Sequence, residues 1–425
     1  MTGSPPRLRR RLVAVGGVAA VLVVLVGLAV FLPLAFREEA RPSGSATAAV
    51  AAAPSARPAT QAEAQAALSK AAAALRAGDR AAYRAALPAT DKRARRALGA
   101  LFRHLSPLPW TTLDLTAVPI ASEQGRFDVF AAGRLAGTGP DDRVAGERVL
   151  RLETRDGVVT AVADVTPKAI EREYLMAFHD PVTVEGDGVL VIADRSSKGR
   201  AETLAAAASA AAPRLRLVGV KPDEQVLVSV YSSLDDLKAS LGGGPDEDRI
   251  RFFSNAGPRL SSRPWRIRDV GVLGPSLDGT GDWLPLMLSH ELTHAYTGQW
   301  FARTAHAPTF LMEGLATAVE GGRDWAPLKE EVATGNQLWP LADAIGTGNL
   351  WMGTSTDDVR LAYLEAASVV RYVLDRWGLA ALRPFLQAVA DSDLSETGLD
   401  QAARDTLGVG WDDFYAGWKE FVPTL

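Results

Sequence analysis

One short stretch, Ser289–His294, constrains the fold more than any other part of the chain. It reads Ser-His-Glu-Leu-Thr-His inside an apolar segment whose pattern predicts a helix over Trp283–Thr297. Residues four apart lie on one face of a helix, so His290 and His294 can offer two imidazole nitrogens to one metal ion. Glu291 lies beside that face, where it can reach a water molecule at the metal. The sequence therefore predicts a helix that carries a metal site.

A catalytic zinc ion takes three protein ligands and keeps a fourth position for water, so a third ligand is needed. Eighteen residues separate His294 from Glu313, which lies in the segment Thr309–Ala316 at the start of another apolar, Ala-rich helical pattern. We predict that His290, His294 and Glu313 bind Zn²⁺, and that Glu291 is the general base that takes a proton from water. The alternative is a chance or degenerate motif.

This arrangement resembles the gluzincin metallopeptidases, and the -EG-A- helix around Glu313 is similar to their M1-like branch. The resemblance covers roughly residues 182–425 and implies a zinc metallopeptidase domain with a small mixed sheet, an active-site helix and a helical C-terminal lobe. It also implies a peptide or protein substrate. A strand such as Ile267–Leu273 would border the cleft, where an extended substrate could add to the sheet edge. M1 aminopeptidases carry a G-x-M-E-N loop upstream, whereas Val270–Pro275 has no Glu, so aminopeptidase specificity is not implied.

Further site residues follow from the same resemblance. M1-like enzymes use a Tyr on a later helix to stabilise the oxyanion, and Tyr363 is the first candidate, with Tyr372 the second. A buried tyrosine without a catalytic role is the alternative for Tyr363. Glu320, seven residues after Glu313 on the same helix face, is expected to accept a hydrogen bond from a metal-bound histidine, with a surface salt bridge as the alternative. His306 either contacts substrate or is an ordinary surface residue.

Composition excludes several classes of function. A length of 425 residues predicts two or three domains. The net charge of −4 and the pI of about 5.9 show no overall excess of positive charge, so we expect no nucleic-acid partner. Cysteine is absent, which excludes disulfides, Cys-ligated zinc and a Cys nucleophile. Nothing in the sequence indicates an oligomeric state.

The N-terminal region predicts a membrane anchor. Residues 1–11 form a basic tail, and residues 12–36 are uncharged and mostly apolar, which is long enough for a transmembrane helix. Four arginines precede this segment and two follow it closely, so we expect a single-pass protein of the cell membrane with a cytoplasmic N-terminus and an extracellular catalytic domain. The alternative is a cleaved signal peptide and a secreted protein. Residues 37–60 are rich in Pro, Ser and Ala and predict a disordered linker.

Residues 61–167 form a separate predicted α+β domain. Three helical patterns come first, and alternating runs that predict strands follow, with a hairpin signal at Asp156-Gly157. The predicted helices span 61–76, 79–87 and 90–105, and the predicted strands span 111–118, 126–135, 144–154 and 158–165. This order resembles the cone-shaped NTF2-like fold. His104 is interpreted as a structural or surface residue, and we find no cluster of titratable residues in this domain.

The predicted fold class for the whole chain is α+β. In residues 182–425 the predicted strands include 188–193 and 225–231. The predicted helices include 200–212, stopped by Pro213, then 234–241, 359–377, 379–389, 399–407 and 411–422. A rival to the enzyme is a non-enzymatic surface binding protein, in which the NTF2-like module binds a ligand and the zinc site is structural or degenerate.

Overall fold

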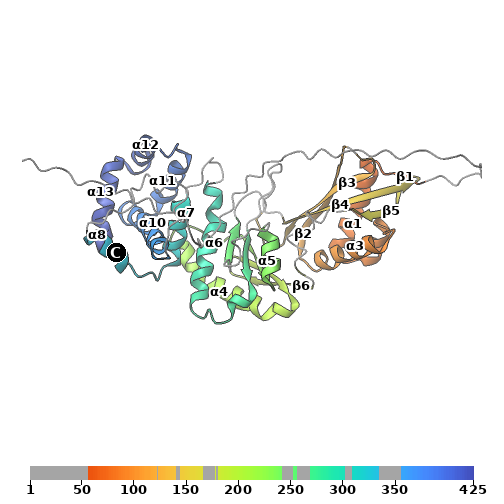
Figure 1. Ribbon diagram of the computed structural model, residues 1–425, viewed down its shortest axis with the longest axis horizontal. Helices are drawn as coiled ribbons and strands as arrows, with labels where there is room; N and C mark the ends of the chain where they lie inside the picture. Colours follow the sequence, from red (N-terminus) through yellow and green to blue (C-terminus); the bar gives the residue numbers. More distant parts are fainter. Residues whose placement is uncertain are drawn as a thin grey trace, which may run out of the picture.

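The structure, a computed structural model, describes residues 56–121, 123–139, 144–165, 178, 180–241, 252–255, 269–301, 309–334 and 356–425. These residues form two β-sheets and two groups of helices (Figure 1), which confirms the predicted α+β class. The predicted basic tail, transmembrane helix and most of the predicted linker lie outside the described residues, and so does His306.

Three helices begin the described chain, and each starts at a capping side chain. They are α1 (Gln61–Arg76), α2 (Arg80–Ala86) and α3 (Lys92–Leu105). Thr60 and Glu63 form a reciprocal capping box at α1, while Asp79 and Asp91 accept backbone N–H groups at the starts of α2 and α3. Because these signals are local, the predicted bounds agree closely with the observed ones. His104 is buried in α3, as a structural role requires.

An antiparallel sheet follows these helices. Its strands are β1 (Arg57–Pro58), β2 (Trp110–Pro119), β3 (Arg126–Leu135), β4 (Val144–Arg155) and β5 (Val158–Asp164), in the order β1-β4-β3-β2 with β5 also paired to β4. Asp156 and Gly157 have positive φ angles and make the predicted hairpin turn between β4 and β5. The end of the predicted disordered linker is wrong, because residues 57–58 pair with β4 and Thr60 caps α1.

The second sheet is mixed. Its strands are β6 (Pro181–Gly186), β7 (Val189–Asp194), β8 (Val226–Tyr231), β9 (Phe252–Asn255) and β10 (Asp269–Leu273), in the order β6-β7-β8-β10-β9. β7, β8 and β10 are parallel to one another, and β6 and β9 run antiparallel at the two ends. The expectation that the strand ending at Leu273 lies at a free edge is therefore wrong, because β10 pairs with β8 on one side and β9 on the other.

Alternate side chains of this sheet belong to two different hydrophobic cores. On β7, Val189, Val191 and Ala193 face the core that contains the helices α4 and α6, whereas Leu190 and Ile192 belong to the core of the N-terminal unit. The same alternation continues along β8 and β10. A strand buried on both faces reads as a continuous apolar run, as β7 and β8 do.

Helices cover one face of the second sheet and continue away from it (Figure 1). They are α4 (Lys198–Arg216), α6 (Trp283–Phe301), α7 (Thr309–Glu320) and α8 (Ala326–Ala333). The helix α5 (Leu234–Leu241) lies on the opposite face and packs into the core of the N-terminal unit. The prediction that Pro213 ends its helix is wrong, since α4 continues to Arg216. Burial of Ala212 and Leu215 favours the helical path past the proline.

A C-terminal helical lobe completes the fold. Its helices are α10 (Thr356–Trp377), α11 (Leu379–Asp391), α12 (Glu396–Leu407) and α13 (Trp411–Phe421). Phe414 of α13 contacts the rings of Tyr372, Trp377, Phe385 and Trp411, so this aromatic cluster packs the lobe together. α10 lies against α7, which connects the lobe to the site helices.

No helix within the described residues is long and apolar enough to cross a membrane. The longest of them, α10, carries several charged side chains, and α6 carries two histidines and a glutamate in the protein interior. The predicted span 12–36 lies outside these residues, so the structure gives that helix no support. The predicted cell-membrane placement is corrected accordingly.

Candidate metal centre

The helix α6 is buried against the second sheet and the helices α4 and α7. His290 is 8 %, Glu291 5 % and His294 3 % exposed. The hydroxyl of Thr293 donates to the carbonyl of Ser289 at 2.7 Å and so needs no other partner. Because His290, Glu291 and His294 are buried, their polar atoms need hydrogen-bond, ion-pair or metal partners on neighbouring helices or strands.

The helix α7 brings Glu313 to these histidines. Every residue of α7 from Phe310 to Glu320 is buried. Gly314 permits a close crossing with α10, because a Cβ at this position would lie 2.5 Å from the backbone oxygen of Ala366. Gly321, with a φ of +64°, follows directly after Glu320 and ends the helix.

Three side-chain atoms converge between α6 and α7. His290 Nε2 and His294 Nε2 lie 3.2 Å apart, and each lies 3.3 Å from Glu313 Oε2. Within the described residues Glu313 Oε2 is buried and has no hydrogen-bond partner. A single cation at the centre would satisfy all three atoms, so the group could hold a metal ion.

The spacing of the three atoms fits a tetrahedral ion. Zinc binds histidine nitrogen and carboxylate oxygen at about 2.0–2.1 Å, so two ligands of a tetrahedron lie about 3.3 Å apart. An octahedral ion with similar bond lengths would bring neighbouring ligands to about 3.0 Å. The observed distances of 3.2–3.3 Å place all three atoms within binding distance of one such ion.

A chain of charged groups supports His290 from behind. Glu320 Oε2 lies 3.2 Å from His290 Nδ1, and Arg323 Nη2 lies 2.5 Å from the same carboxylate oxygen. Arg214 of α4 donates to the backbone carbonyl of Glu320 at 2.8 Å, which fixes the end of α7 against α4. Glu320 is therefore beside a candidate ligand, as predicted, and it is buried rather than part of a surface salt bridge.

Tyr363 of α10 reaches the same site. Its ring centroid lies 6.4 Å from that of His290. Burial, followed by the carboxylates of Glu313 and Glu291, raises the pKa of Tyr363 well above its ordinary value, so its hydroxyl keeps its proton. Tyr372, the second candidate, instead packs among the aromatic side chains of the C-terminal lobe.

The buried carboxylates of Glu313 and Glu320 favour a positive charge at the site. Burial alone would lower the pKa of His290, but Glu313 and Glu320 outweigh it and raise that pKa to about 10. Burial opposes ionisation of Glu313, yet His294 and His290 hold its pKa well below the usual range. The pKa of Glu320 is lowered as well, by His290 and Arg323 against the effect of burial. Without a metal, the buried carboxylates hold a proton on His290.

The sequence predicts six side chains at this site, and the structure adds two contributors that the sequence did not indicate. Arg323 follows Glu320 by three residues, but the intervening Gly321-Gly322 breaks the helical spacing that would have suggested a pair. Arg214 is 106 residues away from its acceptor and gives no local signal. Comparison with protein-family models and with curated protein sequences gives no match.

Proposed function

We propose that this protein is a zinc-dependent metallopeptidase of the gluzincin type that hydrolyses peptide bonds in a peptide or protein substrate. The observation that carries the proposal is the nearly equal spacing of His290 Nε2, His294 Nε2 and Glu313 Oε2, at 3.2–3.3 Å. Within the described residues this group has three donors, as in catalytic zinc sites, whereas structural zinc sites usually have four protein ligands.

The side chains around the site suit peptide hydrolysis. A zinc ion held by His290, His294 and Glu313 supplies a Lewis acid that polarises the peptide carbonyl and acidifies water. Glu291 accepts the proton of the attacking water and passes it to the leaving amine. Its charge acts on both His290 and Tyr363, which supports a position at the centre of the site.

Two further residues have supporting roles in this proposal. Tyr363 donates a hydrogen bond to the oxyanion that develops on the carbonyl, and its raised pKa keeps the hydroxyl protonated for that role. Glu320 accepts the Nδ1–H of His290, which fixes the ring so that Nε2 faces the ion. Arg323 balances the charge of Glu320 in the buried site.

The resemblance also suggests the domain organisation. We propose an NTF2-like unit over residues 61–167 and a peptidase unit over residues 182–425, because three helices followed by an antiparallel sheet precede a mixed sheet with its site helices. We propose internal cleavage or an unusual exopeptidase preference, because β10 and the turn after it carry no Glu to bind a free amino terminus. Strong turnover of simple aminoacyl reporters that N-acetylation abolishes would contradict this preference.

The decisive experiment separates binding of the ion from proton transfer. Glu291→Gln keeps the side-chain shape but cannot accept a proton, so it should retain about one zinc per chain and lose about 10²–10⁴-fold in peptidase activity. His290→Ala, His294→Ala and Glu313→Ala should each lose the zinc, because too few donors remain. Tyr372→Phe is the matched control for Tyr363→Phe. It should leave activity unchanged, whereas Tyr363→Phe should lower it by roughly 10²-fold.

The readouts are elemental analysis and cleavage of a peptide library with and without a chelator. Undiminished zinc in all three ligand variants would place the metal elsewhere. Equal activity of wild type and Glu291→Gln would remove the proposed catalytic role of that carboxylate. It would favour the rival, a binding protein with a structural metal site.

A further inference from the structure

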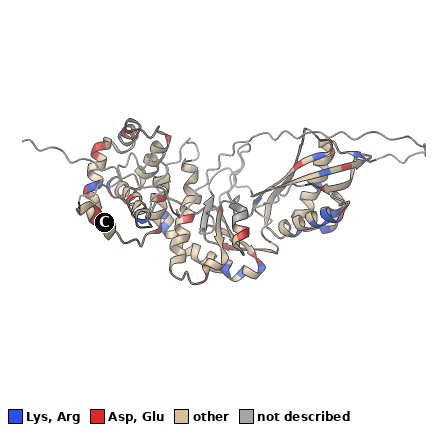
Figure 2. Ribbon diagram, viewed as in Figure 1, with Lys and Arg blue, Asp and Glu red and all other residues tan. Residues whose placement is uncertain are grey.

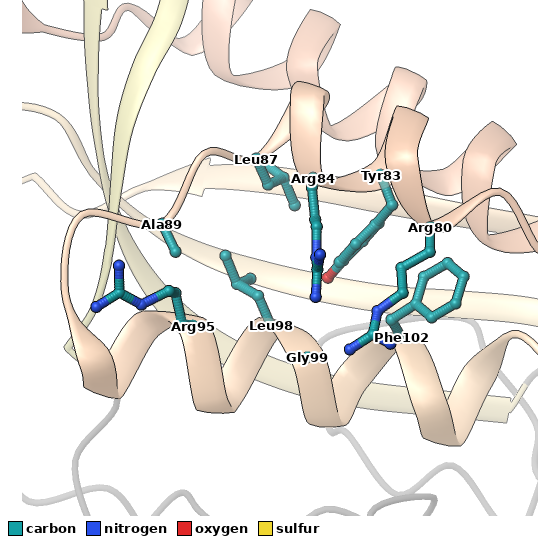
Figure 3. A pocket seen from close by; sticks show the side chains of 9 residues that line it. All are labelled: Arg80, Tyr83, Arg84, Leu87, Ala89, Arg95, Leu98, Gly99 and Phe102. Carbon is teal, nitrogen blue, oxygen red and sulfur yellow. The ribbon is translucent and has the colours of Figure 1, made fainter.

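A pocket of about 310 Å³ lies between α2 and α3, away from the metal centre. Figure 3 shows Arg80, Tyr83 and Arg84 reaching from α2 toward α3, with Arg95 at the other end of the pocket. Leu87, Ala89, Leu98, Gly99 and Phe102 complete the lining. Sequence reasoning found no such cluster, because these residues come from two helices separated by a turn.

The floor of the pocket is apolar. Leu87, Leu98, Tyr83 and Phe102 are buried, and the rings of Tyr83 and Phe102 lie 5.2 Å apart between centroids, so they make one continuous wall. Gly99 leaves this wall open, because a Cβ built there would meet only Arg103 Nη1, at 3.8 Å. Glycine is unfavourable inside a helix, and here its absent side chain creates space.

The rim of the pocket is basic. Arg80 and Arg84 are four residues apart on α2, where like charges destabilise a helix. Within the described part of the chain, the side chains of Arg80, Arg84 and Arg95 form no ion pair or hydrogen bond. Residues 80–105 contain seven Lys or Arg and one acid, Asp91, whose carboxylate caps α3. Figure 2 shows this gathering of basic residues on α3 in a chain whose net charge is −4.

We propose that this pocket binds a small amphipathic anion, a carboxylate on an acyl or aryl body. The apolar floor takes the body, and the guanidinium groups, which match carboxylates with paired hydrogen bonds, take the head. The volume lies at the lower end of the range of ligand sites, which fits a medium-length chain. The bound anion also relieves the repulsion between Arg80 and Arg84 on α2. The site is independent of the metal centre and of peptidase activity.

The test is isothermal titration of the full chain with decanoate, 1-decanol and acetate. Decanoate should bind at one site per chain, and the alcohol and acetate should each bind at least about tenfold more weakly, since each lacks half of the recognised chemistry. Gly99→Leu fills the open space and should abolish decanoate binding while zinc content and thermal stability stay as in wild type. Ala81→Leu, an exposed position of α2 outside the lining, should bind normally.

Charge is tested separately, so that the proposal does not depend on the folding of one variant. Arg84→Gln should weaken decanoate binding about tenfold, whereas Arg96→Gln removes the same charge from α3 outside the lining and should change it little. Three results would overturn the proposal: no decanoate binding at millimolar concentration, unchanged binding by Gly99→Leu, or equal losses in the two arginine variants. Equal losses together with salt-sensitive binding to phosphatidylglycerol vesicles would identify a basic surface for anionic lipid instead.

Discussion

The close crossing of α7 and α10 can be tested with one methyl group. In Gly314→Ala the new Cβ would lie 2.5 Å from Ala366 O, while ordinary contact begins at 3.4 Å, so the helices must separate by about 0.9 Å. Overpacking of this kind costs about 1–3 kcal/mol, and the better helix propensity of alanine returns about 0.5–1 kcal/mol. We therefore expect a net loss of roughly 0–2.5 kcal/mol in the free energy of unfolding.

The functional effect should exceed the effect on stability. Separation of the helices moves Tyr363, on α10, away from Glu313 and His290, and a misplacement near 1 Å can cost about 10²-fold in rate. The assay is kcat/KM on a library-derived peptide, with zinc content and thermal unfolding measured in parallel. Gly99→Ala is the matched control, since its Cβ meets no atom closer than 3.8 Å, and it should stabilise the protein slightly.

A double-mutant cycle identifies the route of the effect. If Gly314→Ala acts by displacing Tyr363, it should cost little additional activity in a Tyr363→Phe background. Full additivity of the two losses would show that the crossing does not position the tyrosine. A Gly314→Ala protein as active and as stable as Gly99→Ala would refute the close crossing itself.

Two further predictions concern charge at the site. In the metal-free protein the pKa of His290 is raised from its unfolded value of 6.5 to about 10. The stability that protonated His290 contributes is therefore complete below pH 6.5 and is lost as the pH rises to about 10. Thermal unfolding of the chelated protein should show this loss. A melting temperature that stays constant over that pH window would contradict the prediction. Arg323→Gln leaves Glu320 without its cation, so zinc affinity measured by chelator competition should fall by roughly 10–100-fold. Arg383→Gln, a surface arginine of α11, should leave it unchanged, and equal affinities in both variants would exclude a positioning role for Arg323.

Local signals explain which parts of the fold were predictable. The bounds of α1 follow from the Thr60–Glu63 box and the end of its Ala-rich pattern, and β3 follows from its alternation. Pro213 misled the prediction because burial of neighbouring side chains outweighs the proline's local preference. The position of β10 inside its sheet depends on β9, whose pairing comes from the tertiary fold rather than from a local pattern.

The site residues that follow a helical spacing in the sequence were the ones that could be predicted from it. His290, His294 and Glu320 follow from helical spacing, and the structure brings them together with Glu313. The position of Tyr363 came from family resemblance, and the structure places that ring near His290. The basic pocket was missed because charge was judged over the whole chain, where the excess of acids elsewhere conceals a local excess of arginine.

The shared second sheet has a practical consequence for dissecting this protein. Leu190, Ile192, Leu227 and Tyr231 are almost completely buried and belong to the core of the N-terminal unit. In a fragment that begins at the second sheet, these side chains would form an exposed apolar patch on one face of the sheet. The two units should therefore melt in one transition, and expression of the metal-binding half alone should yield aggregates. A recombinant product useful for crystallisation or screening must retain the first three helices and their sheet.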